Sequence, residues 1–120
     1  MQEIGIDTAL LNDILSGTKT IEGRLGKSRF LGWRVGDTIS LRKDVWKQGR
    51  IDHSVHNCGI IKIKQLLRFE SFDEMFRAVN FKSTIPAVST TAEAISTYRR
   101  YYSMEDEQKY GVVTIVFELV

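Results

Sequence analysis

The sequence has one proline, one cysteine and no long hydrophobic run that is free of charge. A lone cysteine, Cys58, excludes an internal disulfide and fits a reducing compartment. No uncharged run reaches the roughly 20 residues that a membrane helix needs, and the N-terminus has no basic segment followed by an apolar one. From these absences we expect a cytoplasmic protein that no segment targets or anchors to a membrane.

The composition is that of a folded domain, without repeats, low-complexity segments or linkers. Of the 120 residues, 42% are hydrophobic and 27% are charged, and this length suits one domain with a buried core rather than two. The formal net charge of +2 is too small to select a partner by itself. We therefore expect a single domain over residues 1–120, and the sequence leaves open whether it is a monomer or a weak dimer.

Helices are predicted from apolar spacing and from residues suited to helix ends. Residues 8–16 carry leucine and isoleucine at helical spacing, with Asp7 or Thr8 available as the N-cap and Gly17 to end the helix. Later helices are predicted where Ser or Thr lies three residues before an acidic residue, which is the spacing of a capping box. These pairs are Ser71 with Glu74, Thr90 with Glu93, and Ser103 with Asp106.

Most of the other segments are predicted to be strands, because they are β-branched or alternate between apolar and polar residues. The predicted strands are 18–25, 38–42, 58–69 and 112–120, with room for a short one at 4–6. The last is almost wholly apolar, which is typical of a central strand buried on both faces. Segments 26–36 and 43–57 are predicted to be loops, the second with a wide hairpin as its alternative. This order of elements indicates a mixed, curled sheet and the α+β class.

The stretch from Gly17 to Arg24, reading Gly-Thr-Lys-Thr-Ile-Glu-Gly-Arg, concentrates charge where the first helix meets the following strand. Successive side chains of a strand alternate faces, so Thr20, Glu22 and Arg24 would share one side, with Lys19 on the other. Two cations and a carboxylate in this arrangement could form a polar pocket that holds a phosphate or the edge of a base. They could also form a structural ion pair on a solvated strand, which contributes only ~0–1 kcal/mol.

Four motifs, in order, resemble those of the ASCH domain family and together cover nearly the whole chain. They are Gly17 to Arg24, which resembles the G-x-K-x-x-E-x-R signature, Trp33 to Asp37 with its Val-Gly-Asp turn, Phe69 to Phe76, and Tyr101 to Val113. The resemblance implies a PUA-like fold, an α+β curled β-barrel of about 5–6 strands flanked by short helices. It also implies that the signature lines a cleft that binds RNA or a nucleobase derivative.

The preferred function is therefore a non-enzymatic module that binds RNA or a modified nucleoside. The residues expected to bind the ligand are Lys19, Thr20, Glu22, Arg24, Lys62, Lys64, Arg99 and Tyr102. Lys62 and Lys64, with Arg68, would form a basic strand face that tracks a phosphate backbone. Trp33 or Trp46 could add a stacking platform. The alternative for this face is an ordinary charged sheet surface that discourages aggregation.

A small hydrolase that acts on a nucleoside or on RNA is the alternative function. Similar enzymes remove the acetyl group from acetylcytidine with a threonine, a lysine and a glutamate. Lys19 matches their lysine, but Glu22 stands where they have threonine, and no carboxylate occurs near Val88, where their glutamate falls. Without that hydroxyl the acyl-transfer route lacks its attacking atom, unless Thr20 replaces it. The candidate catalytic residues are Lys19 and Glu22. Glu22 could act as a general base on water, whereas Lys19 could act with a tyrosine to cleave RNA by proton transfer.

His53, His56 and Cys58 supply three potential metal ligands close together. Structural zinc takes four ligands, and the chain has no further cysteine or histidine, although Asp52 could supply an oxygen. A solvated loop is the better interpretation of this segment. We therefore expect neither a metal nor a cofactor.

Overall fold

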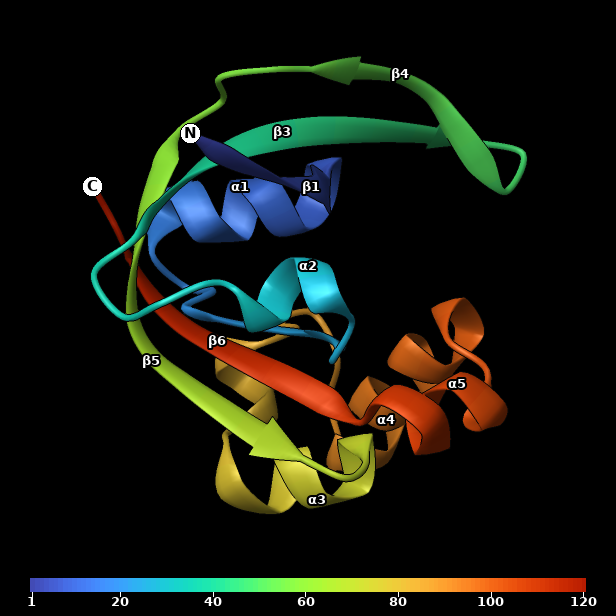
Figure 1. Cartoon of the computed structure of the whole chain (residues 1–120). Helices are drawn as coiled ribbons and strands as arrows, with labels where there is room; N and C mark the ends of the chain where they lie inside the picture. Colours follow the sequence, from blue (N-terminus) through green and yellow to red (C-terminus); the bar gives the residue numbers. More distant parts are fainter.

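A mixed six-stranded sheet forms the frame of the protein, seen in a computed structural model that describes all of residues 1–120 (Figure 1). The strands are β1 (Gln2–Asp7), β2 (Ile21–Leu25), β3 (Thr38–Lys47), β4 (Arg50–Val55), β5 (Ile60–Phe69) and β6 (Val112–Leu119). They follow the order β1-β3-β5-β6-β2, and β4 pairs with β3 outside this path. β1 runs parallel to β3, and every other pair is antiparallel.

Short helices pack around this sheet. They are α1 (Thr8–Ser16), α2 (Ser28–Leu31), α3 (Phe72–Ala78), α4 (Thr91–Tyr101) and α5 (Met104–Tyr110), with a 3-10 turn, η1 (Phe81–Ser83). Four of them begin after a side chain that accepts a hydrogen bond from the backbone N–H three residues later: Asp7, Ser71, Thr90 and Ser103. Gly17 ends α1 in the left-handed conformation, with φ 87°. The predicted caps are therefore confirmed, whereas α2 lies within the predicted loop 26–36. None of the helices has the length and apolar character needed to cross a bilayer.

The sheet curls on itself and leaves an open seam between β1 and β2, its two end strands. Arg24 of β2 reaches across this seam and donates a hydrogen bond to the Gly5 carbonyl of β1 at 2.9 Å. Side chains rather than strand pairing thus connect the two edges. The α+β class and the curled sheet are confirmed, with the correction that the sheet is not closed into a barrel.

β2 begins at Ile21, three residues later than the predicted strand. The N–H groups of Thr18 and Lys19 both donate to the Asp13 carbonyl, at 2.9 and 3.0 Å, and so close the end of α1. The N–H of Thr20 donates to a carbonyl of η1 at 2.9 Å. This segment turns before the strand starts, so Thr20 precedes β2 instead of lying within it as predicted.

The segment 43–57 lies mostly in a β-hairpin, which was the alternative prediction for it, instead of in a loop. β3 continues to Lys47 and β4 returns from Arg50, through a turn at Gln48 and Gly49 with φ of 53° and 76°. Positive φ at both central residues gives the turn the twist that tight hairpins need. Glutamine rarely adopts a positive φ, so the sequence does not predict this turn.

Two hydrophobic clusters hold the helices on the sheet. One packs α1 and α2 against β1, β3, β5 and β6, and the other packs α3 and α4 beside β2. β6 contributes to both, with Val113 and Ile115 in the first and Val112 in the second. The prediction of a buried central strand at the C-terminus is therefore confirmed. In the second cluster Tyr98 of α4 stacks on Phe72 of α3, with ring centroids 4.7 Å apart.

Candidate functional site

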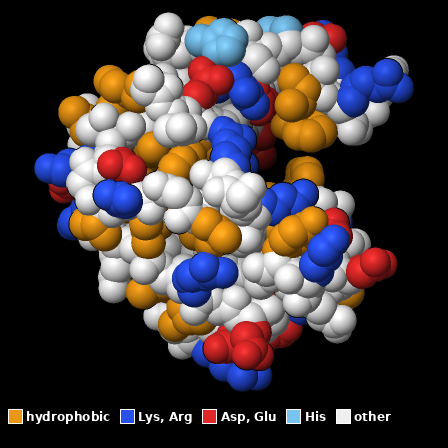
Figure 2. Space-filling view, viewed as in Figure 1, with side chains coloured by type: hydrophobic (Ala, Val, Ile, Leu, Met, Phe, Trp, Pro, Cys, Tyr) orange, Lys and Arg blue, Asp and Glu red, His pale blue; other side chains and the backbone are white.

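A pocket of about 360 Å³, which we call the seam pocket, lies where the sheet remains open. Its walls come from β1 and β2 on either side of the seam, from the β3–β4 hairpin and from α4. Figure 2 shows a notch in the side of the molecule, between the hairpin and the helical part. The volume falls within the ~300–1,000 Å³ of typical ligand sites, so the pocket can hold one small organic group.

Glu22 lies in the wall on the β2 side, with its side chain only 6% exposed. Oε1 accepts hydrogen bonds from the Tyr98 hydroxyl at 2.7 Å and from the Gly23 N–H at 2.9 Å. Oε2 lies 3.5 Å from both Lys19 Nζ and Arg24 Nη2. Burial alone would raise the pKa of Glu22, but the two cations and the hydrogen bonds outweigh burial and hold that pKa below its ordinary value. Glu22 is therefore a fixed, ionised carboxylate.

Lys19 is enclosed in the protein instead of facing the pocket. Its side chain is 0% exposed, and Nζ donates to the carbonyls of Ile21 and Thr84 at 2.6 Å each. With Glu22 as a third neighbour, no N–H of the ammonium remains for a ligand. Burial is the main cause that lowers the pKa of Lys19. Neither Lys19 nor Thr20 lines the seam pocket, so Glu22 is the one predicted catalytic residue that faces it.

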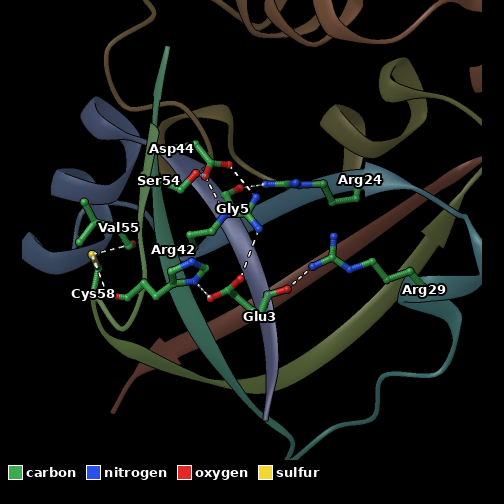
Figure 3. Close-up of polar contacts among 10 residues, drawn as sticks. Glu3, Gly5, Arg24, Arg29, Arg42, Asp44, Ser54, Val55 and Cys58 are labelled. Carbon is green, nitrogen blue, oxygen red and sulfur yellow. Dashed lines mark hydrogen bonds and ion pairs between the residues drawn. The ribbon is translucent and has the colours of Figure 1, made fainter. Parts of the chain in front are cut away.

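An arginine–aspartate pair forms part of the opposite wall, on β3. Arg42 donates from Nε and Nη2 to the two Asp44 oxygens at 2.7 and 2.9 Å, and from Nη1 to Glu3 at 3.2 Å (Figure 3). Ser54 donates to Asp44 at 2.6 Å. The hydrogen bonds from Arg42 are the main cause that lowers the pKa of Asp44. Sequence reasoning missed Asp44 because the predicted strand ended at Arg42, so that the alternation of side chains along β3 was not followed to this residue.

Gly5 provides the space that the Arg42–Asp44 pair occupies, because a Cβ at Gly5 would overlap both side chains. We expect Gly5→Ala to displace this pair and to lower the free energy of unfolding by about 1–3 kcal/mol, the typical effect of overpacking, measured by urea denaturation. Gly32→Ala is the matched control, because space is open there and φ is −84°. The control is expected to change stability by no more than about 0.5 kcal/mol. Equal effects of the two substitutions would contradict this role of Gly5.

Two exposed aromatic side chains meet at the pocket, Trp46 from β3 and Tyr101 from α4. Their ring centroids are 6.1 Å apart and their planes are inclined by 63°. Trp46 is 45% exposed and Tyr101 is 62% exposed, so both offer ring surface to a ligand. Tyr102, one of the residues expected to bind the ligand, also lines the pocket, whereas Trp33 is buried in the core.

Besides Lys19 and Thr20, three more of the predicted ligand-binding residues lie outside the seam pocket. Lys62 and Lys64 are exposed on β5. The guanidinium of Arg99 is held by Glu107 and Asp73 in an ion cluster between helices. Lys62 and Lys64 on β5 therefore do not join Glu22 and Arg24 at the seam pocket.

The histidines weighed as metal ligands pair with carboxylates. Nδ1 of His53 lies 2.7 Å from Asp52, and Nδ1 of His56 lies 2.7 Å from Glu3. The Cys58 thiol donates to the backbone carbonyls of Val55 at 3.2 Å and His56 at 3.9 Å. No group of three or more His, Cys, Asp or Glu side chains is arranged to hold a metal ion.

Comparison with known families adds the decisive observation, because the ASCH domain family model matches residues 4–120. The chain belongs to the ASCH domain family. The resemblance found in its motifs is thereby confirmed. ASCH domains are in general RNA-binding in character. No curated protein gives a significant match to this ASCH domain.

Solved structures similar to this ASCH domain share its fold over nearly its whole length. The hypothetical protein PH0355 superposes with a TM-score of 0.82 at 29% identity, over 99% of this chain and 98% of that one. Protein PF0455 from Pyrococcus furiosus superposes with a TM-score of 0.73 at 31% identity, over 99% of this chain and 96% of that one. ZmASCH from Zymomonas mobilis, solved as a point mutant, superposes with a TM-score of 0.54 at 14% identity, over 98% of this chain and 66% of that one. At this identity the similarity supports the fold alone.

The charged residues of the ASCH signature have different positions in this domain. Lys19 stabilises the start of β2 from inside the protein, whereas Glu22 and Arg24 face the seam pocket from that strand. Gly23 lies between them, and a Cβ there would crowd the Met75 sulfur at 3.0 Å. The signature therefore both builds the wall of the pocket and supplies its polar groups.

Proposed function

We propose that this ASCH domain binds RNA or a modified nucleoside by taking a single unpaired base into the seam pocket. The observation that carries the proposal is the exposed pair of Trp46 and Tyr101 at a pocket with polar walls. Proteins that bind single-stranded RNA stack splayed-out bases on such aromatic rings and read the base edges by hydrogen bonds. The seam pocket combines both requirements in one place.

The polar groups of the pocket suit a base that carries an amine beside a carbonyl. Oε2 of Glu22 has only its two ion-pair contacts at 3.5 Å, so it can accept a hydrogen bond from an exocyclic amine. Arg24 uses one nitrogen on Gly5 and retains N–H groups for a base carbonyl. Cytosine and guanine present an amine and a carbonyl on their pairing edge. We therefore propose one of these bases, or a derivative, as the ligand.

The same geometry gives less support to a hydrolase. A general base works best when its pKa is near the working pH, whereas the pKa of Glu22 is held below its ordinary value. Lys19 is enclosed, and Thr20 lies outside the pocket wall, so neither reaches a ligand there. Recognition without turnover is therefore the function we propose. Release of acetate from acetylcytidine by the purified protein would contradict it.

Tyr101→Ala is expected to weaken binding of a short cytosine-rich single-stranded RNA roughly 10-fold or more, because stacking contributes about 1–3 kcal/mol per base. Fluorescence anisotropy of labelled RNA at low salt, where electrostatic attraction is strongest, measures the affinity. The control is the double variant Lys62→Ala/Lys64→Ala, which removes two exposed charges outside the pocket and should change affinity less than Tyr101→Ala does. The opposite order would assign binding to the basic strand face, and undetectable binding would overturn the proposal.

A further inference from the structure

Three arginines line the seam pocket, and one of them lacks an acidic partner. Arg42 is paired with Asp44, and Arg24 lies 3.5 Å from Glu22. Arg29 of α2 has no carboxylate at salt-bridge distance, and its guanidinium donates to a backbone carbonyl of β1. Arg29 is therefore the arginine of the pocket wall that makes no salt bridge.

The surroundings of Arg29 favour an anion. Burial, followed by the charges of Arg24 and Arg42, lowers the pKa of Arg29. The negative charge of Glu3 is the smallest influence on Arg29 and acts against this shift, and the Glu3 oxygens bind Arg42 at 3.2 Å and His56 at 2.7 Å instead of Arg29. Figure 3 shows Arg29 reaching the β1 backbone, with the rest of its guanidinium facing no partner among the residues drawn. A ligand anion at this point would meet an unpaired guanidinium in a positive field.

We infer that Arg29 binds a phosphate of the ligand, so that the seam pocket takes a nucleotide unit rather than a bare nucleoside. This inference rests on the proposed function and specifies the anion that its ligand carries. A planar guanidinium presents two N–H groups that match two phosphate oxygens, which makes arginine the residue suited to such a contact. Arg29 is exposed at the pocket wall, where a phosphate attached to an inserted base would remain in contact with solvent.

The phosphate could belong to a free nucleotide or to an RNA strand, and three ligands distinguish these sources. They are cytidine, cytidine monophosphate and the dinucleoside monophosphate CpC, each titrated by calorimetry. We expect both phosphate-bearing ligands to bind at least ~10-fold more tightly than cytidine, because hydrogen bonds to charged groups are the stronger ones. Tighter binding of CpC would assign the phosphate to an RNA strand, and tighter binding of the monophosphate would assign it to a free nucleotide.

Arg29→Gln is expected to remove most of the advantage of the phosphate-bearing ligands while leaving the affinity for cytidine unchanged. Its slope of log affinity against log salt should fall by about one unit, as for one lost phosphate contact. The matched control is Arg34→Gln, because Arg34 is also an exposed arginine near α2 but lies outside the pocket. Circular dichroism establishes that both variants are folded.

Two results would overturn the phosphate site while leaving base binding in place. One is equal affinity of the unmodified protein for cytidine and for both phosphate-bearing ligands. The other is an equal loss of affinity in Arg29→Gln and Arg34→Gln. Absence of binding for all three ligands would overturn the proposed function and this inference together.

Discussion

Lys19→Met is expected to lower the free energy of unfolding by about 3–5 kcal/mol, the usual effect of removing one partner of a buried ion pair. The ammonium is enclosed and bonded to the carbonyls of Ile21 and Thr84, beside Glu22. Its removal leaves two buried carbonyls without a donor and leaves Arg24 as the one cation beside Glu22. Methionine keeps an unbranched apolar stem, so little of the effect comes from a cavity.

Urea denaturation followed by circular dichroism measures this loss, with Lys62→Met as the matched control. Lys62 is exposed on β5, so its replacement should change the free energy of unfolding by less than about 0.5 kcal/mol. If Lys19→Met costs less than about 1 kcal/mol, the value of an exposed ion pair, the structural role of Lys19 is wrong. Lys19 would then return to the candidates for direct contact with the ligand.

The helix caps could be predicted from sequence and the role of Lys19 could not, because the caps bind groups close in sequence and Lys19 binds a distant one. A capping side chain and the N–H group that it binds are three residues apart, so the sequence predicted each of them. Lys19 instead binds Thr84, which is 65 residues away. The motif predicted that Lys19, Glu22 and Arg24 act together, but the direction of each side chain depended on where β2 begins.

The β3–β4 hairpin was harder to predict because β4 has no buried face. Five of its six residues are exposed, so it shows none of the alternation by which a half-buried strand is identified. Trp46 was evident as a large apolar residue, but its contact with Tyr101 depends on how the hairpin lies against α4. The hairpin side of the seam pocket therefore depends on tertiary contacts, which cannot be predicted from the local sequence pattern.

The seam pocket exists because the sheet does not close, and no local signal specifies that outcome. Parallel pairing of β1 with β3 and antiparallel pairing of β2 with β6 put the edges of β1 and β2 on either side of the gap. Arg24 and Arg29 then donate to carbonyls along the β1 edge. The arginines that bridge the gap also line the pocket, so the open sheet and the candidate site have one structural origin.

Glu107→Ala is expected to destabilise the domain by about 3–5 kcal/mol, because it leaves buried polar groups without their carboxylate. Glu107 of α5 is 2% exposed, accepts from the Phe72 N–H at 2.9 Å and accepts from Arg99 on both oxygens at 3.1 Å. Asp73 would remain as the other partner of Arg99. The matched control is Glu105→Ala, because Glu105 shares the first turn of α5 but is exposed. Urea denaturation of the two variants separates the buried contacts from the common effect of an acidic residue at a helix start.

We also expect Glu107 to affect the seam pocket through α4, because it holds Arg99 of that helix. Arg99 lies on that helix between Tyr98, which binds Glu22, and Tyr101 at the pocket. Loss of the Arg99 anchor should let α4 shift, so we expect weaker RNA binding by anisotropy at a temperature where circular dichroism shows the variant folded. If Arg99 contacted RNA directly, releasing it from Glu107 would instead strengthen binding. Unchanged affinity would mean that the stacking of Tyr98 on α3 is enough to hold α4 in place.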